Sequence, residues 1–174
     1  MTPDRMCTSI VLPTLKLMAD MPDVGIPVSD TAVVELVAIA GQESGWSARR
    51  QIGIGQYYPQ TVGARSYWQM ESTWGGPVAI NDVMQRVPNK LAAVCAYLEI
   101  PTDELGLYEA CAWNDTLACA LARLLLWIDP SPLPALGQKD VAWNYYVRNW
   151  HPGAPHYESW YGNYDAAMQA LRAA

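Results

Sequence analysis

The sequence contains no phenylalanine, although it has eight tryptophans and ten tyrosines. Tyr and Trp combine an apolar ring with a polar group, which suits a wet cleft as well as a core. We therefore expect some of these rings to replace phenylalanine in the core and others to line a cleft.

Basic residues are also scarce, since 11 Lys and Arg stand against 17 Asp and Glu, for a formal net charge of −6. No basic stripe is present to meet phosphates, which excludes nucleic acid as a partner. The negative charge gives no attraction to an anionic membrane, and no apolar run is long enough to span a bilayer. We expect neither nucleic-acid binding nor membrane insertion.

Metal ligands are few, with two histidines and four cysteines and no Cys-x-x-Cys pair. Neither a zinc site nor another metal site is expected, and nothing indicates a cofactor. His151 and His156 lie in a proline-containing loop with no triad partners nearby in the sequence, so we assign them no catalytic role. The cysteines are expected as reduced thiols that pack as small apolar groups; they are Cys7, Cys95, Cys111 and Cys119.

A basic N-terminal segment of the secretory type is absent, and Pro13 and Lys16 interrupt the apolar stretch that follows the first residues. We expect a product made in the cytoplasm without a signal peptide. The 174 residues are 51% hydrophobic and 16% charged, which predicts one folded domain over residues 1–174. The segment that follows the proline-rich stretch 129–137 is too short for a core of its own.

Helical periodicity recurs along the chain and strand signals are weak, so the predicted fold class is all-α. Residues 45–62 are expected as a loop, and 129–137 as an extended crossing. Asn114 or Asp115 is expected to cap the most apolar helix, which we place at the centre of the fold. The predicted helices cover residues 6–20 (kinked or started at Pro13), 30–44, 77–86, 88–98, a short segment capped by 101–104, 117–127, 138–150 and 156–172.

Glu43 lies at the end of the helix predicted over residues 30–44, on the same stripe as Leu36, Ile39 and Ala40. A carboxylate on a face that should be buried is unfavourable. It is therefore either paired with a cation, or its pKa is raised and it holds a proton for use in a reaction. The cations that would serve a purely structural pair are Arg49, Arg50 and Arg148.

Three segments of the chain together resemble motifs of the lysozyme-like muramidases. They are Glu43-Ser44-Gly45 at a helix end, the strip from Gly63-Ala64 to Trp68-Gln69, and a late helix with aromatic residues and an asparagine. The resemblance is to goose-type lysozymes and soluble lytic transglycosylases, particularly small phage-encoded ones. It implies a single helical domain with a substrate cleft and the glycan strand of peptidoglycan as partner. Nothing in the sequence indicates an oligomer, so we expect a monomer, and we expect no cofactor. Only about a dozen positions carry it.

The resemblance implies that Glu43 is the catalytic acid. It also implies a set of substrate-binding residues, which are Ser44, Gly63, Tyr67, Trp68, Gln69, Tyr146, Asn149 and Trp150. In the late segment Tyr145–Trp150 the aromatic residue and the asparagine do not follow each other in the order that the family shows, so either Tyr146 or Trp150 can be the cleft aromatic. The second motif departs from the family where Arg65, Ser66 and Tyr67 replace a glycine-bearing middle. Simple alternatives are that Gln69 caps a turn and that most late aromatic residues pack in the core.

Glu71 bears on the type of reaction. The resemblance places it where goose-type enzymes carry an aspartate that positions water, so we include it as catalytic and lean toward hydrolysis. Inversion by water needs a second carboxylate about 6.5–9.5 Å from the acid. In a lytic transglycosylase the C6 hydroxyl of the sugar attacks instead and a 1,6-anhydro product forms. Glu71 could also be a carboxylate near the first amides of residues 72–86, and Asp82 and Asp115 are weaker candidates for the second carboxylate.

The leading hypothesis is therefore a phage muramidase that cleaves the β-1,4 bond between N-acetylmuramic acid and N-acetylglucosamine. It would act on the cell wall after release as an endolysin, or as a virion component. The alternatives are a lytic transglycosylase, a catalytically degenerate virion structural or glycan-binding domain, and a chitinase of related fold.

Overall fold

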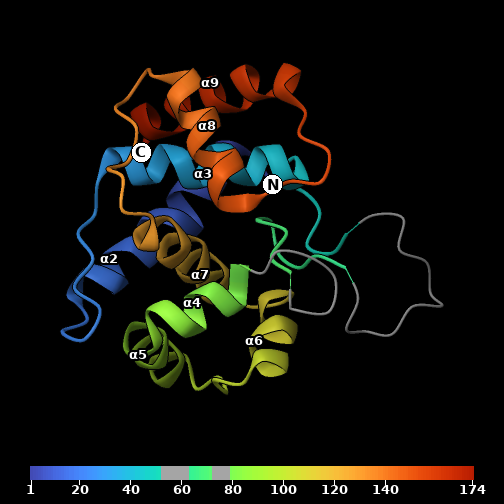
Figure 1. The fold of residues 1–174 in the computed structure, drawn as a ribbon. Helices are drawn as coiled ribbons and strands as arrows, with labels where there is room; N and C mark the ends of the chain where they lie inside the picture. The colour runs from blue at the N-terminus through green and yellow to red at the C-terminus, as the bar shows by residue number, and fades with distance from the viewer. Residues whose placement is uncertain (52–62, 72–78) are drawn as a thin grey trace.

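The computed structural model describes residues 1–51, 63–71 and 79–174 (Figure 1). Within these ranges every regular element is helical, so the all-α prediction is confirmed for them, and Arg65 forms isolated bridges with Arg50 and Met70. The elements are α1 (Pro3–Met6), the π-helix η1 (Cys7–Val11), α2 (Leu12–Asp20), α3 (Asp30–Ser44), α4 (Ala79–Arg86), α5 (Pro88–Leu98), α6 (Glu104–Cys111), α7 (Asp115–Ile128), α8 (Lys139–Trp150) and α9 (Tyr157–Ala173).

The N-terminal helix begins earlier than predicted, and its irregularity comes before Pro13. Proline has no N–H to donate, and its ring clashes with the carbonyl four residues back in an α-helix. A π-helical turn over Cys7–Val11 absorbs this misfit, and the Leu12 N–H bonds to the Cys7 carbonyl. The chain therefore continues through Pro13 as a helix instead of breaking there.

Helix α3 has the bounds expected from its sequence. The Ser29 hydroxyl accepts a hydrogen bond from the Ala32 N–H (3.2 Å) and caps the first turn. Gly45 ends the helix in the left-handed conformation, with φ of 57°. The chain then folds back, so that the Trp46 ring lies against Gly41, where a Cβ atom would come within 2.3 Å of it. This close approach requires glycine at position 41 and fixes the end of α3.

The helices form two groups with α7 between them (Figure 1). Helix α3 packs most extensively against α9, and α8 also contacts both. On the other side, α4, α5 and α6 all contact α7, which also contacts α2 and α3. The central position predicted for the most apolar helix is confirmed, and Asn114 is its N-cap.

The core takes in most of the late aromatic residues, as expected. Buried rings include Tyr145, Tyr146, Trp150, Trp160 and Tyr164, whereas Tyr157 and Tyr161 are exposed. All four cysteines are buried and unbridged. No single described helix is long and apolar enough to cross a membrane, although α6 and α7 meet the length and composition criteria as a pair bent by 116°.

Candidate functional site

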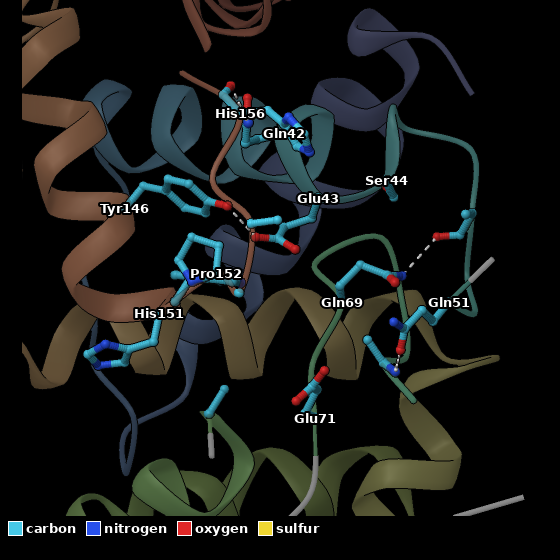
Figure 2. A pocket seen from close by; sticks show the side chains of 16 residues that line it. Gln42, Glu43, Ser44, Gln51, Gln69, Glu71, Tyr146, His151, Pro152 and His156 are labelled. Atoms are coloured by element: carbon cyan, nitrogen blue, oxygen red, sulfur yellow. Dashed lines mark hydrogen bonds between the residues drawn. The ribbon is translucent and has the colours of Figure 1, made fainter. Parts of the chain in front are cut away.

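A cavity of about 660 Å³ lies between the end of α3, the strip 63–71, the end of α8 and the loop 151–156. Figure 2 shows Glu43 projecting from α3 into this space, with Gln69 and Glu71 facing it from the strip. The predicted site residues that line the cavity are Glu43, Ser44, Gln69, Glu71, Tyr146 and Trp150. Segments far apart in the sequence therefore meet at one hollow.

Glu43 is the carboxyl group with the most distinctive setting in this cavity. The Tyr146 hydroxyl donates a hydrogen bond of 2.6 Å to its Oε1 atom. Burial raises the pKa of Glu43 to about 7; the hydrogen bond from Tyr146 opposes this rise and the nearby charge of Glu71 adds to it. A carboxyl group with a pKa near 7 keeps a useful fraction of its proton at neutral pH, as a general acid must.

The alternative of a structural ion pair at Glu43 is wrong for the described residues. Arg49 Nη2 lies 2.6 Å from Asp115 Oδ2, and Arg148 Nε lies 2.8 Å from Asp129 Oδ2. The third candidate cation, Arg50, has Glu109 as its ion-pair partner at 4.0 Å.

Both hypotheses for Gln69 agree with its position. Its Nε2 atom donates to the Ser66 carbonyl (2.7 Å) and, at 3.4 Å, to the Ala48 carbonyl, so the side chain closes a turn. Its backbone has φ of 48°, an uncommon conformation for a residue with a side chain. This strained backbone places Gln69 in the cavity wall while its amide holds the turn.

Glu71 lines the same cavity, and burial raises its pKa. No hydrogen bond to its carboxylate comes from the described part of the chain. The alternative that places Glu71 near the first amides of residues 72–86 falls partly on 72–78, which lie outside the described residues; α4 begins at Ala79. Of the weaker candidates, Asp115 pairs with Arg49 and Asp82 lines a different cavity.

Trp68 does not line the cavity, contrary to its predicted role as a substrate-binding residue. It is completely buried, and its indole N–H donates to the Leu36 carbonyl (2.9 Å). Its own carbonyl accepts a 2.9 Å hydrogen bond from the Trp150 indole. Trp68 therefore joins the strip to α3 and α8. Its ring was predicted to line the cleft, but it packs in the core.

Three further predicted binding residues also lie away from this cavity. The Tyr67 ring is buried and its hydroxyl accepts from Arg49 Nε (3.0 Å). The Gly63 carbonyl accepts from the Tyr108 hydroxyl. Asn149 Nδ2 donates to Asp129 Oδ2 at 2.8 Å, and the side chain lines a neighbouring cavity. Of the two alternatives for the cleft aromatic, Tyr146 and Trp150 both line the main cavity, and Tyr146 contacts Glu43.

The rim loop 151–156 belongs to the site although the sequence gave us no role for its histidines. Both His151 and His156 line the cavity. Gln42 secures this loop, because its Nε2 atom donates to the His156 carbonyl (2.9 Å), while its Oε1 accepts from Ser159 (3.1 Å) and Asn163 (2.9 Å) of α9. The position of Gln42 directly before Glu43 was the only signal in the sequence. Ser44, on the other side of Glu43, bonds back to the Ala40 carbonyl (2.8 Å).

A second carboxyl group of α3, Glu35, is more deeply buried than Glu43. None of the described residues makes a hydrogen bond with its side-chain oxygens, and burial raises its pKa to about 8. Glu35 does not line the cavity. A perturbed carboxyl group alone is therefore not enough to mark the site; Glu43 is distinguished because it is both perturbed and open to the cavity.

Among the described residues no group of three His, Cys, Asp or Glu side chains is arranged to hold a metal ion. Comparisons with protein-family models, curated proteins and solved structures find no match.

Proposed function

We propose that this chain is a peptidoglycan-cleaving glycosidase of the lysozyme-like superfamily, with Glu43 as its general acid. One observation carries the proposal: the Glu43 carboxyl opens into a 660 Å³ cavity with a pKa of about 7, held in place by Tyr146. Glycosidic cleavage needs a carboxylic acid that is still protonated at working pH.

In the proposed reaction the Glu43 proton passes to the oxygen that leaves from N-acetylmuramic acid, and the β-1,4 bond to the next N-acetylglucosamine breaks. Trp150 and Gln69 in the cavity wall offer an aromatic edge and an amide to the sugars. The wall of a bacterial cell would be reached after release from a host, or with a virion that carries the protein.

The second step separates hydrolysis from transglycosylation. Glu71 lies in the same cavity as Glu43, which favours hydrolysis with Glu71 as the base that activates water. The alternative is a lytic transglycosylase. Attack by the C6 hydroxyl of the sugar does not need such a base.

Digestion of purified peptidoglycan, followed by mass spectrometry of the released muropeptides, tests the proposal. Hydrolysis yields products with reducing muramic acid, and transglycosylation yields 1,6-anhydro products lighter by one water. Chitin serves as the second substrate. Cleavage of chitin alone would identify a chitinase, and no cleavage of either polymer would favour a glycan-binding or structural domain.

Glu71→Gln is expected to lower hydrolysis by about 10²-fold or more if Glu71 activates water. The same change would leave a transglycosylase largely active, because the sugar supplies its own nucleophile. The charge of Glu71 raises the pKa of Glu43, so the neutral glutamine should lower that pKa. The residual activity should therefore fall on the alkaline side at a lower pH than in wild type. The measurement is the rate and mass of released products as a function of pH. Glu99→Gln, the same replacement at an exposed residue that lines neither cavity, is the control.

Tyr146→Phe is expected to move the alkaline limb of activity to higher pH by about one unit. The Tyr146 hydroxyl stabilises the ionised form of Glu43, so its removal raises the pKa of Glu43 further and keeps the acid protonated at higher pH. The matched control is Tyr145→Phe at the next position, because the Tyr145 hydroxyl donates to the Leu126 carbonyl (2.8 Å) and not to Glu43. Identical pH profiles for the two variants would contradict the role given to Tyr146.

A further inference from the structure

A second cavity, of about 340 Å³, adjoins the main one, and His151 lines both. Its walls differ from those of the main cavity, because they carry charges of both signs: Arg86 and Asp82 from α4, Arg148 from α8, and Asp129 from the segment after α7. Because its walls carry charged side chains, this second cavity is not suited to neutral sugar rings alone.

Asp129 does not need a ligand, because its carboxylate is already satisfied. It accepts hydrogen bonds from Arg148 Nε, Asn149 Nδ2 and the Ser131 N–H, each 2.8 Å long. Burial alone would raise the pKa of Asp129, but the hydrogen bonds from Arg148, Ser131 and Asn149 hold it at about 2. Asp129 therefore stays ionised and fixes the position of the Arg148 guanidinium.

Arg148 and Arg86 each have guanidinium N–H groups that make no hydrogen bond to the described residues. Arg148 uses its Nε atom on Asp129, lies over the Tyr145 ring at 4.9 Å, and makes no hydrogen bond from its two terminal nitrogens to the described residues. Arg86 uses one terminal nitrogen on the Ile128 carbonyl (2.9 Å). The guanidinium fork matches a carboxylate with two parallel hydrogen bonds, and it remains charged at any physiological pH.

Asp82 supplies the opposite charge in the same hollow. It lies one helical turn before Arg86 on α4, yet it forms no ion pair with it or with another described cation. The cavity thus offers guanidinium groups for carboxylates and a carboxylate for an ammonium group. A zwitterionic peptide has this pattern of charges, whereas a glycan strand without peptides does not.

We propose that this charged cavity binds the stem peptide that branches from the muramic acid in the main cleft. Carboxylates of the peptide would lie on Arg86 and Arg148, and the ammonium group of its diamino acid on Asp82. This inference rests on the proposed function, since a stem peptide is attached to the glycan only in peptidoglycan. His151 lines both cavities, so the proposed peptide site lies directly beside the proposed glycan site.

A direct binding experiment tests the proposal apart from catalysis. The probe is the free tetrapeptide L-Ala-γ-D-Glu-meso-diaminopimelate-D-Ala, titrated into the full chain by calorimetry. Saturable binding is expected, weakened about tenfold in Arg86→Gln and in Asp82→Asn and unchanged in Glu43→Gln. Arg172→Gln, the same replacement at an exposed site on α9, is the control. Absence of saturable binding, or equal binding by Arg86→Gln and Arg172→Gln, would overturn the proposal.

Arg148 is a less suitable site for the first variant, because its loss leaves the Asp129 carboxylate without a cation. Arg148→Lys keeps the charge and removes the fork, and we expect it to bind the tetrapeptide more weakly while its unfolding temperature stays close to that of wild type. Unchanged affinity in both Arg148→Lys and Arg86→Gln would also overturn the proposal.

A second comparison uses peptidoglycan with its stems and glycan strands stripped of stems by an amidase. Arg86→Gln should lower kcat/KM about tenfold on the first substrate and leave it unchanged on the second. An equal loss on both substrates would contradict peptide recognition. Failure of the wild-type chain to cleave either substrate would count against the proposed function, while tetrapeptide binding would still decide whether the charged cavity is a peptide site.

Discussion

Glu43→Gln should lower the rate of peptidoglycan cleavage by about 10²–10⁴-fold, because the amide occupies the same volume but has no acidic proton to give. The hydrogen bond from Tyr146 can still be accepted by the amide oxygen, so the geometry of the cavity should be retained. The measurements are the clearing of outer-membrane-stripped cells and the release of muropeptides. Clearing at the wild-type rate would mean that Glu43 is not the acid and that the enzymatic proposal is wrong.

Glu35→Gln is the matched control for this variant. It makes the same replacement on the same helix, at a carboxyl group whose pKa is also raised, but one that lies in the core and not in the cavity wall. The folded Glu35→Gln protein should cleave peptidoglycan at a rate close to that of wild type. An equal loss in both variants, with circular dichroism showing intact helices, would contradict a specific chemical role for Glu43.

The pH dependence of wild-type activity follows from the same carboxyl group. Burial raises the pKa of Glu43 to about 7, so the protonated acid is present below that pH and is lost above it. Activity should therefore fall on the alkaline side with a midpoint near pH 7. If Glu71 activates water, activity should also fall on the acidic side and the pH profile should be bell-shaped, because Glu71 must be ionised to act as a base.

The second large effect concerns stability: Glu35→Leu should raise the free energy of unfolding at pH 8 by about 2–4 kcal/mol. Glu35 is 1% exposed, and neither of its oxygens has a hydrogen-bond partner in the described part of the chain, so both its neutral and its ionised forms are unfavourable in the core. Leucine removes the polar group and fills a similar volume.

The sign of the pH effect follows from the raised pKa of Glu35. The unfolded chain releases this proton near pH 4.5, whereas the folded chain holds it until about pH 8. Wild-type stability should therefore decrease as pH rises from about 4.5 to about 8. Urea unfolding at pH 5 and pH 8 should show this decrease, and Glu35→Leu should reduce it; the remainder belongs to groups such as Glu43, whose pKa is raised too. A variant less stable than wild type at pH 8 would show that the carboxyl group is favourably placed.

Local patterns were sufficient to predict most helices. Helix α3, from Asp30 to Ser44, was expected with the same bounds, because Ser29 is a strong N-cap and Gly45 readily adopts the left-handed conformation that ends a helix. Helix α5 was expected from Pro88, whose missing N–H needs no partner in the first turn. The π-helical turn before Pro13 was not expected, since it depends on how the chain continues on both sides of the proline.

The sequence alone determined the helical class, the ends of helices with clear caps such as α3, and Glu43 as a candidate acid, because capping and periodicity act over a few neighbouring residues. Only the tertiary structure decided which side chains reach the cavity. Trp68 and Asn149 belong to motifs that suggested the cleft, yet Trp68 is held in the core by α3 and Asn149 lies with Asp129 in the charged cavity. Glu35 and Glu43 lie on one helix, and only the packing of α8 and α9 and the rim loop around α3 leaves Glu43 open while it closes Glu35 from water. Solvent exposure depends on contacts between segments distant in the chain, and no local pattern encodes them.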